Sequence, residues 1–346
     1  MNIRILPTLA LAGLLGGLTG CPAGGDDDTA GSTGNPTTNP TDGSGTDTPT
    51  GTSGDPTGGV DGQLCTDLGG VDGITALIGN FVGRVLVDDR INAYFLKTDV
   101  DGGNLTKCLI EQISAATMCA GATYTCGDMT AVHAGMGISQ ADFDDLAGDF
   151  SDAMDEHQKT YNTLTDDEKA AILAVLGSMA PMIVEDKTSD VTVYQRLGRK
   201  PGIKTVVGDG TDPKAFIGVV VADAEINGFF GAANVPRLQT CLVRQVTGAT
   251  AGGFLGDIYG KEVTAPAPAD PGVTTENPCK DMVSSHKDLK DDMGVAITSA
   301  DFNALVMDLV TAMTNFDVPM AEQNAIAGAL LPLCPDIVVV DPENCP

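Results

Sequence analysis

Two stretches of this chain carry the same motifs in the same order, and this internal repeat limits the folds that the chain can adopt. Residues 90–95 (Arg-Ile-Asn-Ala-Tyr-Phe) match residues 225–230 (Glu-Ile-Asn-Gly-Phe-Phe), and residues 138–143 (Ile-Ser-Gln-Ala-Asp-Phe) match residues 297–302 (Ile-Thr-Ser-Ala-Asp-Phe). Between these matches, each stretch has an Asp-Met pair followed by a histidine. Such self-similarity indicates two domains with one architecture. We place them at residues 63–187 and 190–341.

Helix-start signals occur at matching places in the two copies. Ser139 with Asp142, and Thr298 with Asp301, have the spacing of a capping box that an acid closes. Apolar residues at helical spacing follow each box: Phe143, Leu146, Phe150 and Met154 in the first copy, and Phe302, Leu305, Val306, Leu309 and Met313 in the second. These patterns predict one amphipathic helix after each box.

Two more segments of the first copy have a helical pattern. Thr165 and Glu168 begin a helix that runs through Met179, and an apolar stripe extends from Ile74 to Val85. Residues 219–221 (Val-Val-Val) are the best strand candidate, but the aligned residues of the first copy fall inside the apolar stripe. We therefore expect an all-α fold.

Taken together, these motifs resemble the first group of the truncated haemoglobin family, present twice in tandem. In the first copy the resemblance rests on Leu-Gly-Gly (68–70), Val-Leu-Val-Asp-Asp-Arg (85–90), Tyr-Phe (94–95), Tyr-Thr (124–125), Met-Thr-Ala-Val-His (129–133) and Phe143. In the second copy it rests on Tyr-Gln-Arg-Leu-Gly (194–198), Val-Ala-Asp (221–223), Phe-Phe (229–230), residues 282–286 and Phe302. The second copy departs from the family by insertions at 208–213 and 258–277 and by extra residues between His286 and Ile297.

The resemblance implies a two-on-two sandwich of helices around one haem b in each domain. The family's proximal iron ligand is the histidine that ends the Met-x-x-x-His stretch, which implies His133 and His286 as ligands. A single neutral imidazole is sufficient for each iron because the porphyrin supplies the other four donors. His157 has no counterpart in the second copy, and we expect it to be a solvated surface residue.

The resemblance also implies which side chains contact the haems. The expected contacts are Phe81, Val82, Phe95, Leu105, Leu109, Tyr124 and Met129 in the first copy, and Phe216, Ile217, Phe230, Leu238, Leu242 and Met282 in the second. Phe95 and Phe230 stand where the family packs a phenylalanine flat against the haem, a position that ordinary core packing explains equally well.

The ligand-binding side departs from the family. The tyrosine expected after the helix phenylalanine is Val82 in the first copy and Ile217 in the second. The facing helix offers leucines, so no obvious hydrogen-bond donor faces a bound ligand, which argues against tight oxygen binding and nitric oxide dioxygenation. Gln112, Gln245 and Tyr124 are the alternative donors if the helix register or a loop differs from this alignment.

The cysteines indicate an exported protein with disulfides. The chain has nine cysteines, and setting Cys21 aside leaves an even set, as expected in an oxidising compartment. In both copies one cysteine directly precedes an expected haem-contacting leucine and another lies seven residues before the candidate ligand histidine. This equivalence predicts the pairs Cys108–Cys126 and Cys241–Cys279, and the remaining pairs are Cys65–Cys119 and Cys334–Cys345.

The N-terminus resembles a bacterial lipoprotein signal. Arg4 precedes an apolar stretch shorter than the ~20 residues of a membrane span, and Leu-Thr-Gly (18–20) precedes Cys21. The resemblance implies that residues 1–21 form the signal and that Cys21 carries the lipid anchor. Residues 22–62 contain too few apolar side chains to fold and are expected to be a flexible linker. Pro22, in place of an aspartate, favours the outer membrane of the bacterial cell envelope.

Charge and motifs exclude several functions. The net charge of −28 would repel nucleic-acid phosphates, so we expect no nucleic-acid partner. The sequence has no Gly-x-Ser-x-Gly, no metalloprotease histidine pair, no phosphate-binding Gly-Lys loop and no Cys-x-x-Cys-His. Acidic pairs such as Asp144-Asp145 and Asp166-Asp167 are expected to solvate helix faces and caps.

The sequence therefore favours an exported, membrane-anchored haem protein over an enzyme. It would bind a diatomic gas, namely oxygen, nitric oxide or carbon monoxide, or exchange electrons with a redox partner. The alternative is a globin fold that has lost its haem and serves as a surface interaction module.

Overall fold

The structure is a computed structural model that describes residues 62–95, 101–260 and 270–346. The predicted signal, Cys21 and all but the last residue of the predicted linker lie outside these ranges. Within them the chain forms helices and loops, with two isolated β-bridges and no β-strand, so the all-α prediction is confirmed. Among the described helices, none has both the length and the apolar character needed to cross a bilayer.

The helices are named here in chain order, with residues 63–187 called the first half and residues 190–341 the second half. The first half contains α1 (Gln63–Asp67), α2 (Gly70–Val85), α3 (Gly102–Ala116), α4 (Met129–His133), α5 (Gln140–Tyr161) and α6 (Asp166–Ile183). The second half contains α7 (Val193–Arg196), α8 (Arg199–Val207), α9 (Phe216–Ala222), α10 (Val235–Ala251), α11 (Gly253–Gly260), α12 (Met282–His286), α13 (Ser299–Asn315), α14 (Met320–Leu330) and α15 (Cys334–Ile337). Short 3-10 helices are η1 (Asn92–Phe95), η2 (Asn227–Phe229), η3 (Leu331–Leu333) and η4 (Pro342–Asn344).

The predicted capping boxes begin the long helices of both halves. Ser139 begins α5, and its amide donates to the Asp142 carboxylate at 2.9 Å while the Asp142 amide donates back to the Ser139 hydroxyl at 3.2 Å. Thr298 with Asp301 begins α13, and Thr165 begins α6, in the same way. The boxes satisfy amides that lack a partner within the first helical turn.

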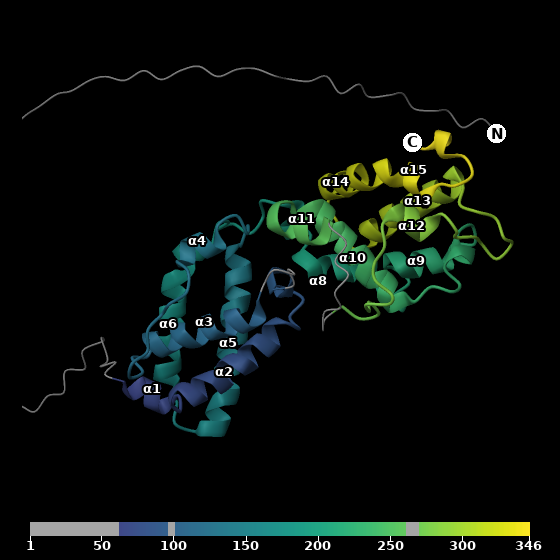
Figure 1. Cartoon of the computed structure of the whole chain (residues 1–346). Helices are drawn as coiled ribbons and strands as arrows, with labels where there is room; N and C mark the ends of the chain where they lie inside the picture. The colour runs from purple at the N-terminus through teal and green to yellow at the C-terminus, as the bar shows by residue number, and fades with distance from the viewer. Residues whose placement is uncertain (1–61, 96–100, 261–269) are drawn as a thin grey trace, which may run out of the picture. The chain divides into compact units, whose positions relative to one another are not determined.

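The core of the first half lies between α2 and α5. Figure 1 shows these two helices together with α3 and α6. Ile74, Leu77 and Phe81 of α2 are buried against α5, where the ring of Phe81 meets that of Phe150 edge to face at 5.1 Å between centroids. The apolar stripe predicted over α2 is therefore the face that forms this core.

Residues 219–221, the weak strand candidate, lie in α9, as the all-α prediction requires. Phe216 and Val220 are buried in a cluster with Ala312 of α13, while Val221 is 51% exposed. Spacing of four residues places Phe216 and Val220 on one helical face. Packing of that face on α13 therefore prevails over the strand preference of valine.

The expectation for His157 is also wrong, since this residue is 5% exposed rather than solvated. Its Nε2 lies 3.0 Å from the carbonyl oxygen of Leu68, and its ring stacks on Tyr161 at 4.3 Å. Because a carbonyl only accepts, Nε2 carries the proton. Burial lowers the pKa of His157, so the ring stays neutral and serves a structural role.

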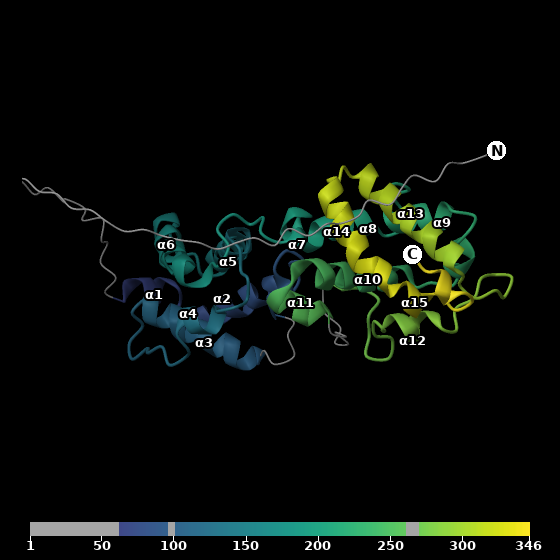
Figure 2. The same cartoon turned by 90° about the horizontal axis from the view of Figure 1, so that it is seen from above.

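A second apolar cluster contains residues of both halves. Tyr94, Ile138 and Phe143 share it with Tyr194 and Ile203. The ring of Tyr94 also stacks on Phe254 of α11, at 6.2 Å between centroids. Figure 2 shows α10 next to α8, α11 and α14. The two predicted domains therefore share part of their core.

Buried ion pairs accompany this shared cluster. Lys200 is 1% exposed, and its Nζ lies 2.7 Å from Asp270 and 3.2 Å from Asp89. Arg199 pairs with Asp142 at 2.8 Å and also with Asp145. The expectation that Asp145 merely solvates a helix face is therefore wrong, because folding brings an arginine from the second half onto it.

A buried carboxylate on α5 lies near Arg90. Asp149 is 7% exposed, and its Oδ1 is 3.9 Å from Nη2 of Arg90. Burial, followed by the negative charge of Asp88, raises the pKa of Asp149 to about 6. Folding therefore changes the protonation of this group near neutral pH.

Loss of the buried Lys200–Asp270 pair should destabilise the protein strongly. We expect Asp270→Ala to lower the free energy of unfolding by about 3–5 kcal/mol, because it leaves a buried lysine charge without its closest carboxylate. Urea unfolding measures the difference. The exposed pair Lys159–Glu156, at 3.0 Å, provides the control, and Glu156→Ala should cost less than about 1 kcal/mol. Equal losses in the two variants would contradict this assignment.

Asp149→Asn should gain stability relative to the wild type as the pH rises from about 4 to 7. The pKa of Asp149 is about 6 in the folded state, against about 3.9 in an unfolded chain. Proton binding to Asp149 therefore stabilises the folded wild type fully below about pH 4, and this stabilisation is lost as the pH rises through the folded pKa. We expect a difference of about 1–2 kcal/mol across this range in urea unfolding. Asp144→Asn, on an exposed part of α5, is the control; a pH-independent difference for Asp149→Asn would refute the prediction.

Candidate haem sites

His133 is the last residue of the five-residue helix α4 and is half-buried. The Asp128 side chain begins the helix by accepting from the amide of Ala131 at 3.1 Å. Nδ1 of His133 lies 2.7 Å from the carbonyl oxygen of Met129, one turn earlier. Since that carbonyl only accepts, Nδ1 donates the hydrogen bond, and in the neutral tautomer with this geometry the lone pair is on Nε2. Nε2 is thus the nitrogen that can bind a metal, and the hydrogen bond of Nδ1 fixes the direction of the ring.

His286 has the same local geometry in the second half. It ends the five-residue helix α12, which Asp281 begins by accepting from the amide of Ser284 at 2.7 Å. Nδ1 of His286 lies 2.7 Å from the carbonyl oxygen of Met282. Burial lowers the pKa of His286, which keeps the imidazole in the neutral form that coordinates iron. The two histidines of the repeat are therefore oriented in the same way.

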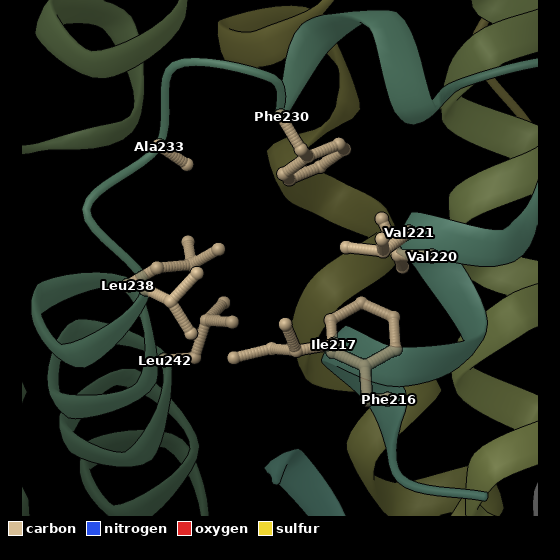
Figure 3. A pocket seen from close by; sticks show the side chains of 9 residues that line it. Phe216, Ile217, Val220, Val221, Phe230, Ala233, Leu238 and Leu242 are labelled. Atoms are coloured by element: carbon tan, nitrogen blue, oxygen red, sulfur yellow. The ribbon is translucent and has the colours of Figure 1, made fainter. Parts of the chain in front are cut away.

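An apolar pocket lies between α9, the segment after η2, and α10. Figure 3 shows Leu238 and Leu242 projecting from α10 toward Ile217 of α9, with Phe230 at the other end of the pocket. The lining residues are Phe216, Ile217, Val220, Val221, Phe230, Ala233, Val235, Leu238 and Leu242. The structure thus brings together all the expected haem-contacting residues of the second half except Met282, which packs in a neighbouring cluster with Phe302. No lining side chain is a hydrogen-bond donor.

In the first half the corresponding residues are divided between two clusters. Val82 and Leu109 pack with Phe81 against the core between α2 and α5. Phe95 packs against both that core and the shared cluster, and Met129 packs only against the shared cluster. Leu105 is half-buried on α3. Phe95 is therefore the expected contact residue that joins the two clusters.

The alternative hydrogen-bond donors lie in three different environments. The hydroxyl of Tyr124 donates to the carbonyl of Gly127 at 2.8 Å, within its own loop. Nε2 of Gln112 lies 2.7 Å from the sulfur of Met179 on α6. Nε2 of Gln245 lies 3.6 Å from the sulfur of Met282, on the helix that carries His286. Among these three, Gln245 is directed toward the candidate ligand helix.

All four predicted cysteine pairs are disulfides in the structure. They are Cys65–Cys119, Cys108–Cys126, Cys241–Cys279 and Cys334–Cys345. The second and third occupy equivalent places, since each joins a leucine-bearing helix, α3 or α10, to the segment that enters α4 or α12.

Sequence reasoning missed one carboxylate beside the first of these links. Glu111 on α3 accepts from the amide of Thr125 at 2.9 Å and from its hydroxyl at 2.8 Å. Hydrogen bonding from Lys107, followed by that from Thr125, lowers the pKa of Glu111 to about 2. An acid on an exposed helix face gives no sequence signal for such a contact, because its partner is a loop residue.

The chemistry of these residues suits a non-covalently bound haem. Each half has a histidine whose Nε2 makes no hydrogen bond within the described residues, and the second half has an apolar wall of the kind that contacts a porphyrin. His286 itself does not line that pocket. Among the described residues, no three His, Cys, Asp or Glu side chains form a metal-binding group. A haem iron requires only one such ligand from the protein, because the porphyrin provides four donors.

Comparison with known proteins finds a truncated haemoglobin related to about a third of the chain. No family model matches the chain. The chain is 29% identical to a group 1 truncated hemoglobin, GlbN of Mycolicibacterium paratuberculosis (strain ATCC BAA-968 / K-10), over 126 residues, which are 36% of this chain and 87% of that protein. A crystal structure of a truncated hemoglobin from Tetrahymena pyriformis in the Fe(III) form matches with 21% identity and a TM-score of 0.31, over 35% of this chain and 97% of that one. The sequence match relates 36% of the chain to the truncated haemoglobins.

Proposed function

We propose that this chain is an exported haem protein that binds a diatomic gas at two sites, with His133 and His286 as the iron ligands. The observation that carries the proposal is the shared geometry of the two histidines. Each ends a five-residue helix with Nδ1 2.7 Å from the carbonyl four residues earlier. The sequence relationship to a truncated haemoglobin supports it. The lipid anchor on Cys21 and a place in the outer membrane of a bacterial envelope are part of the same proposal.

The chain's own residues orient the ligand nitrogen and exclude water. A bound haem would supply the iron centre at which a small gas molecule binds. Donation from Nδ1 to the Met129 and Met282 carbonyls fixes each ring so that Nε2 faces away from its own helix. Leu238, Leu242 and Ile217 line the pocket with apolar groups, which disfavour water and admit an uncharged diatomic molecule.

The apolar pocket favours carbon monoxide and nitric oxide over oxygen. Oxygen gains more negative charge from ferrous iron than carbon monoxide does, so a donor side chain favours oxygen selectively. A hydrogen bond to a charged group contributes about 1.5–3 kcal/mol, which corresponds to roughly ten- to a hundredfold in affinity. The residues that line the pocket provide no such donor. We therefore propose fast oxygen release and ready oxidation, a behaviour suited to gas sensing or electron exchange with a redox partner.

A haem-free interaction module is the second candidate function. Nε2 of Gln245 on α10 lies 3.6 Å from the sulfur of Met282 on α12, a side-chain contact that a fold without a cofactor between the two helices would also make. Haem binding to the mature chain separates the two functions, because the interaction module would show no Soret band after reconstitution with haem.

Replacement of either ligand histidine should remove one ligated iron. We expect two haems per mature wild-type chain, counted from the absorption spectrum of the ferric and dithionite-reduced protein. His133→Ala and His286→Ala should each lose one histidine-ligated haem signal, because each removes the axial nitrogen of its own site. His157→Gln is the matched control, since His157 is bound to the Leu68 carbonyl. Unchanged spectra in His133→Ala would overturn its assignment.

A tyrosine introduced beside the pocket should slow oxygen release. We expect Val82→Tyr and Ile217→Tyr each to slow oxygen dissociation at its own site by roughly ten- to a hundredfold, because the new hydroxyl donates to the bound gas. Stopped-flow measurement on the reduced protein gives the rates. Val71→Tyr, on an exposed part of α2, is the control. If the wild type already releases oxygen slowly and neither tyrosine slows it, a donor such as Gln245 already acts in the pocket.

A further inference from the structure

Apolar packing holds the candidate ligand helices α4 and α12 only through partly buried side chains such as Met129 and Met282. Each has five residues, and neither has a buried residue. Isolated helices shorter than about 12 residues are marginal in water, and helix position normally depends on burial of an apolar face. The location of His133 and His286 therefore depends on how the flanking segments are attached to the rest of the protein.

A disulfide attaches the segment before each helix to the leucine-bearing helix of the same half. Cys126 lies two residues before Asp128, which begins α4, and is bonded to Cys108 of α3. Cys279 lies two residues before Asp281, which begins α12, and is bonded to Cys241 of α10. The Cα–Cα distances are 5.8 and 5.5 Å. The two halves thus place this covalent link at the same distance from the candidate ligand.

A hydrogen bond accompanies the disulfide of the first half. Glu111 lies three residues after Cys108 and binds the amide and hydroxyl of Thr125, the residue directly before Cys126. Nζ of Lys107 lies 2.8 Å from Glu111 and keeps the carboxylate charged and in place. Two independent contacts therefore fix residues 125 and 126 to α3.

The second half has a hydrogen bond at the same joint, made by different chemistry. Arg237 lies four residues before Cys241, and its Nη1 donates to the carbonyl of Pro278 at 3.1 Å. Pro278 directly precedes Cys279, just as Thr125 directly precedes Cys126. The Glu111 carboxylate in the first half and the Arg237 guanidinium in the second thus each hold the residue before the second cysteine of the disulfide. The attachment of this residue to the helix, and not the kind of side chain that makes it, is what the two halves share.

The cysteines of these two disulfides are more accessible than those of Cys65–Cys119. Cys108, Cys126, Cys241 and Cys279 are half-buried, whereas Cys65 and Cys119 are 9% and 6% exposed. Thiol–disulfide exchange requires direct access of a thiolate to a sulfur. A soluble reductant therefore reaches the two matched disulfides before it reaches Cys65–Cys119.

We propose that in each half the disulfide and its neighbouring hydrogen bond form a clamp that positions the candidate ligand helix, and that a thiol reductant opens this clamp before it opens Cys65–Cys119. A dithiol gives two electrons and two protons to the disulfide, the S–S bond breaks to two thiols, and the dithiol becomes its own disulfide. The expected effect on haem retention rests on the proposed function, whereas the expected effect on the positions of α4 and α12 does not.

Hydrogen exchange on the haem-free full-length chain tests the clamp without any cofactor. In the Cys108→Ser/Cys126→Ser variant we expect the amides of α4 to exchange about tenfold faster, with those of α12 unchanged, because local opening becomes less costly. The Cys241→Ser/Cys279→Ser variant should show the reverse pattern, so each variant is the matched control for the other. Equal exchange of α4 in both variants overturns the proposal.

Two further measurements keep the test decisive if a serine variant fails to fold. Glu111→Gln keeps the disulfide but weakens the hydrogen bond to Thr125 at a half-buried residue, and it should speed exchange in α4 alone. In the wild type, limited dithiothreitol followed by alkylation should label Cys108, Cys126, Cys241 and Cys279 before Cys65 and Cys119. Labelling of Cys65 before the other four cysteines overturns the clamp. Exchange of the α4 amides that is unchanged both in Glu111→Gln and in the reduced wild type overturns it as well.

Haem transfer to excess apomyoglobin connects the clamp to the proposed function. Each serine-pair variant should lose one of its two haems about tenfold faster than the wild type, because a mobile ligand helix releases its iron more readily. If the wild type binds no haem, the proposed function fails while the exchange result still decides the clamp. If both haems leave the variants at the wild-type rate, the clamp does not position the ligand helices.

Discussion

One buried carboxylate, that of Asp142, connects the main parts of the described structure. It is 3% exposed and accepts from the amide and hydroxyl of Ser139 at 2.9 and 2.6 Å, from the hydroxyl of Tyr94 at 3.0 Å and from Arg199 at 2.8 Å. A buried charge is tolerated only when donors surround it in this way. The same group therefore begins α5, holds the corner that ends at Phe95, and binds the second half of the chain.

The two halves use equivalent positions for the candidate ligands but differ in what surrounds them. Both histidines have the same orientation, and both ligand helices are joined by a disulfide to the facing helix. The second half adds α11, whose Phe254 stacks on Tyr94 of the first half, and supplies the buried Lys200. The surroundings of the two candidate sites therefore differ, because the corner that carries Phe95 contacts residues from outside its own half.

The pocket of the second half is apolar, whereas another face of the helix α10 that lines it makes polar contacts. Leu238 and Leu242 face the pocket, while Arg244, on another face of α10, is 3% exposed and pairs with Asp270 at 2.9 Å. An amphipathic helix usually separates core from solvent, but α10 separates two buried environments. Any movement of its leucine face therefore requires rearrangement of a buried ion pair, which is costly.

The amino-acid pattern was enough to predict the long helices α2, α5, α6 and α13, the equivalent places of the two histidines, and the pairs Cys108–Cys126 and Cys241–Cys279. Capping boxes and apolar spacing are local properties, and cysteines at repeated positions restrict pairing without any knowledge of distance. Only the tertiary structure decided which polar side chains are buried and what they contact. His157, Asp145 and Glu111 all lie in polar stretches, yet they bind Leu68, Arg199 and Thr125 respectively. Their partners are separated from them along the chain, and a hydrogen bond depends on direction and solvent access, which a one-dimensional pattern does not contain.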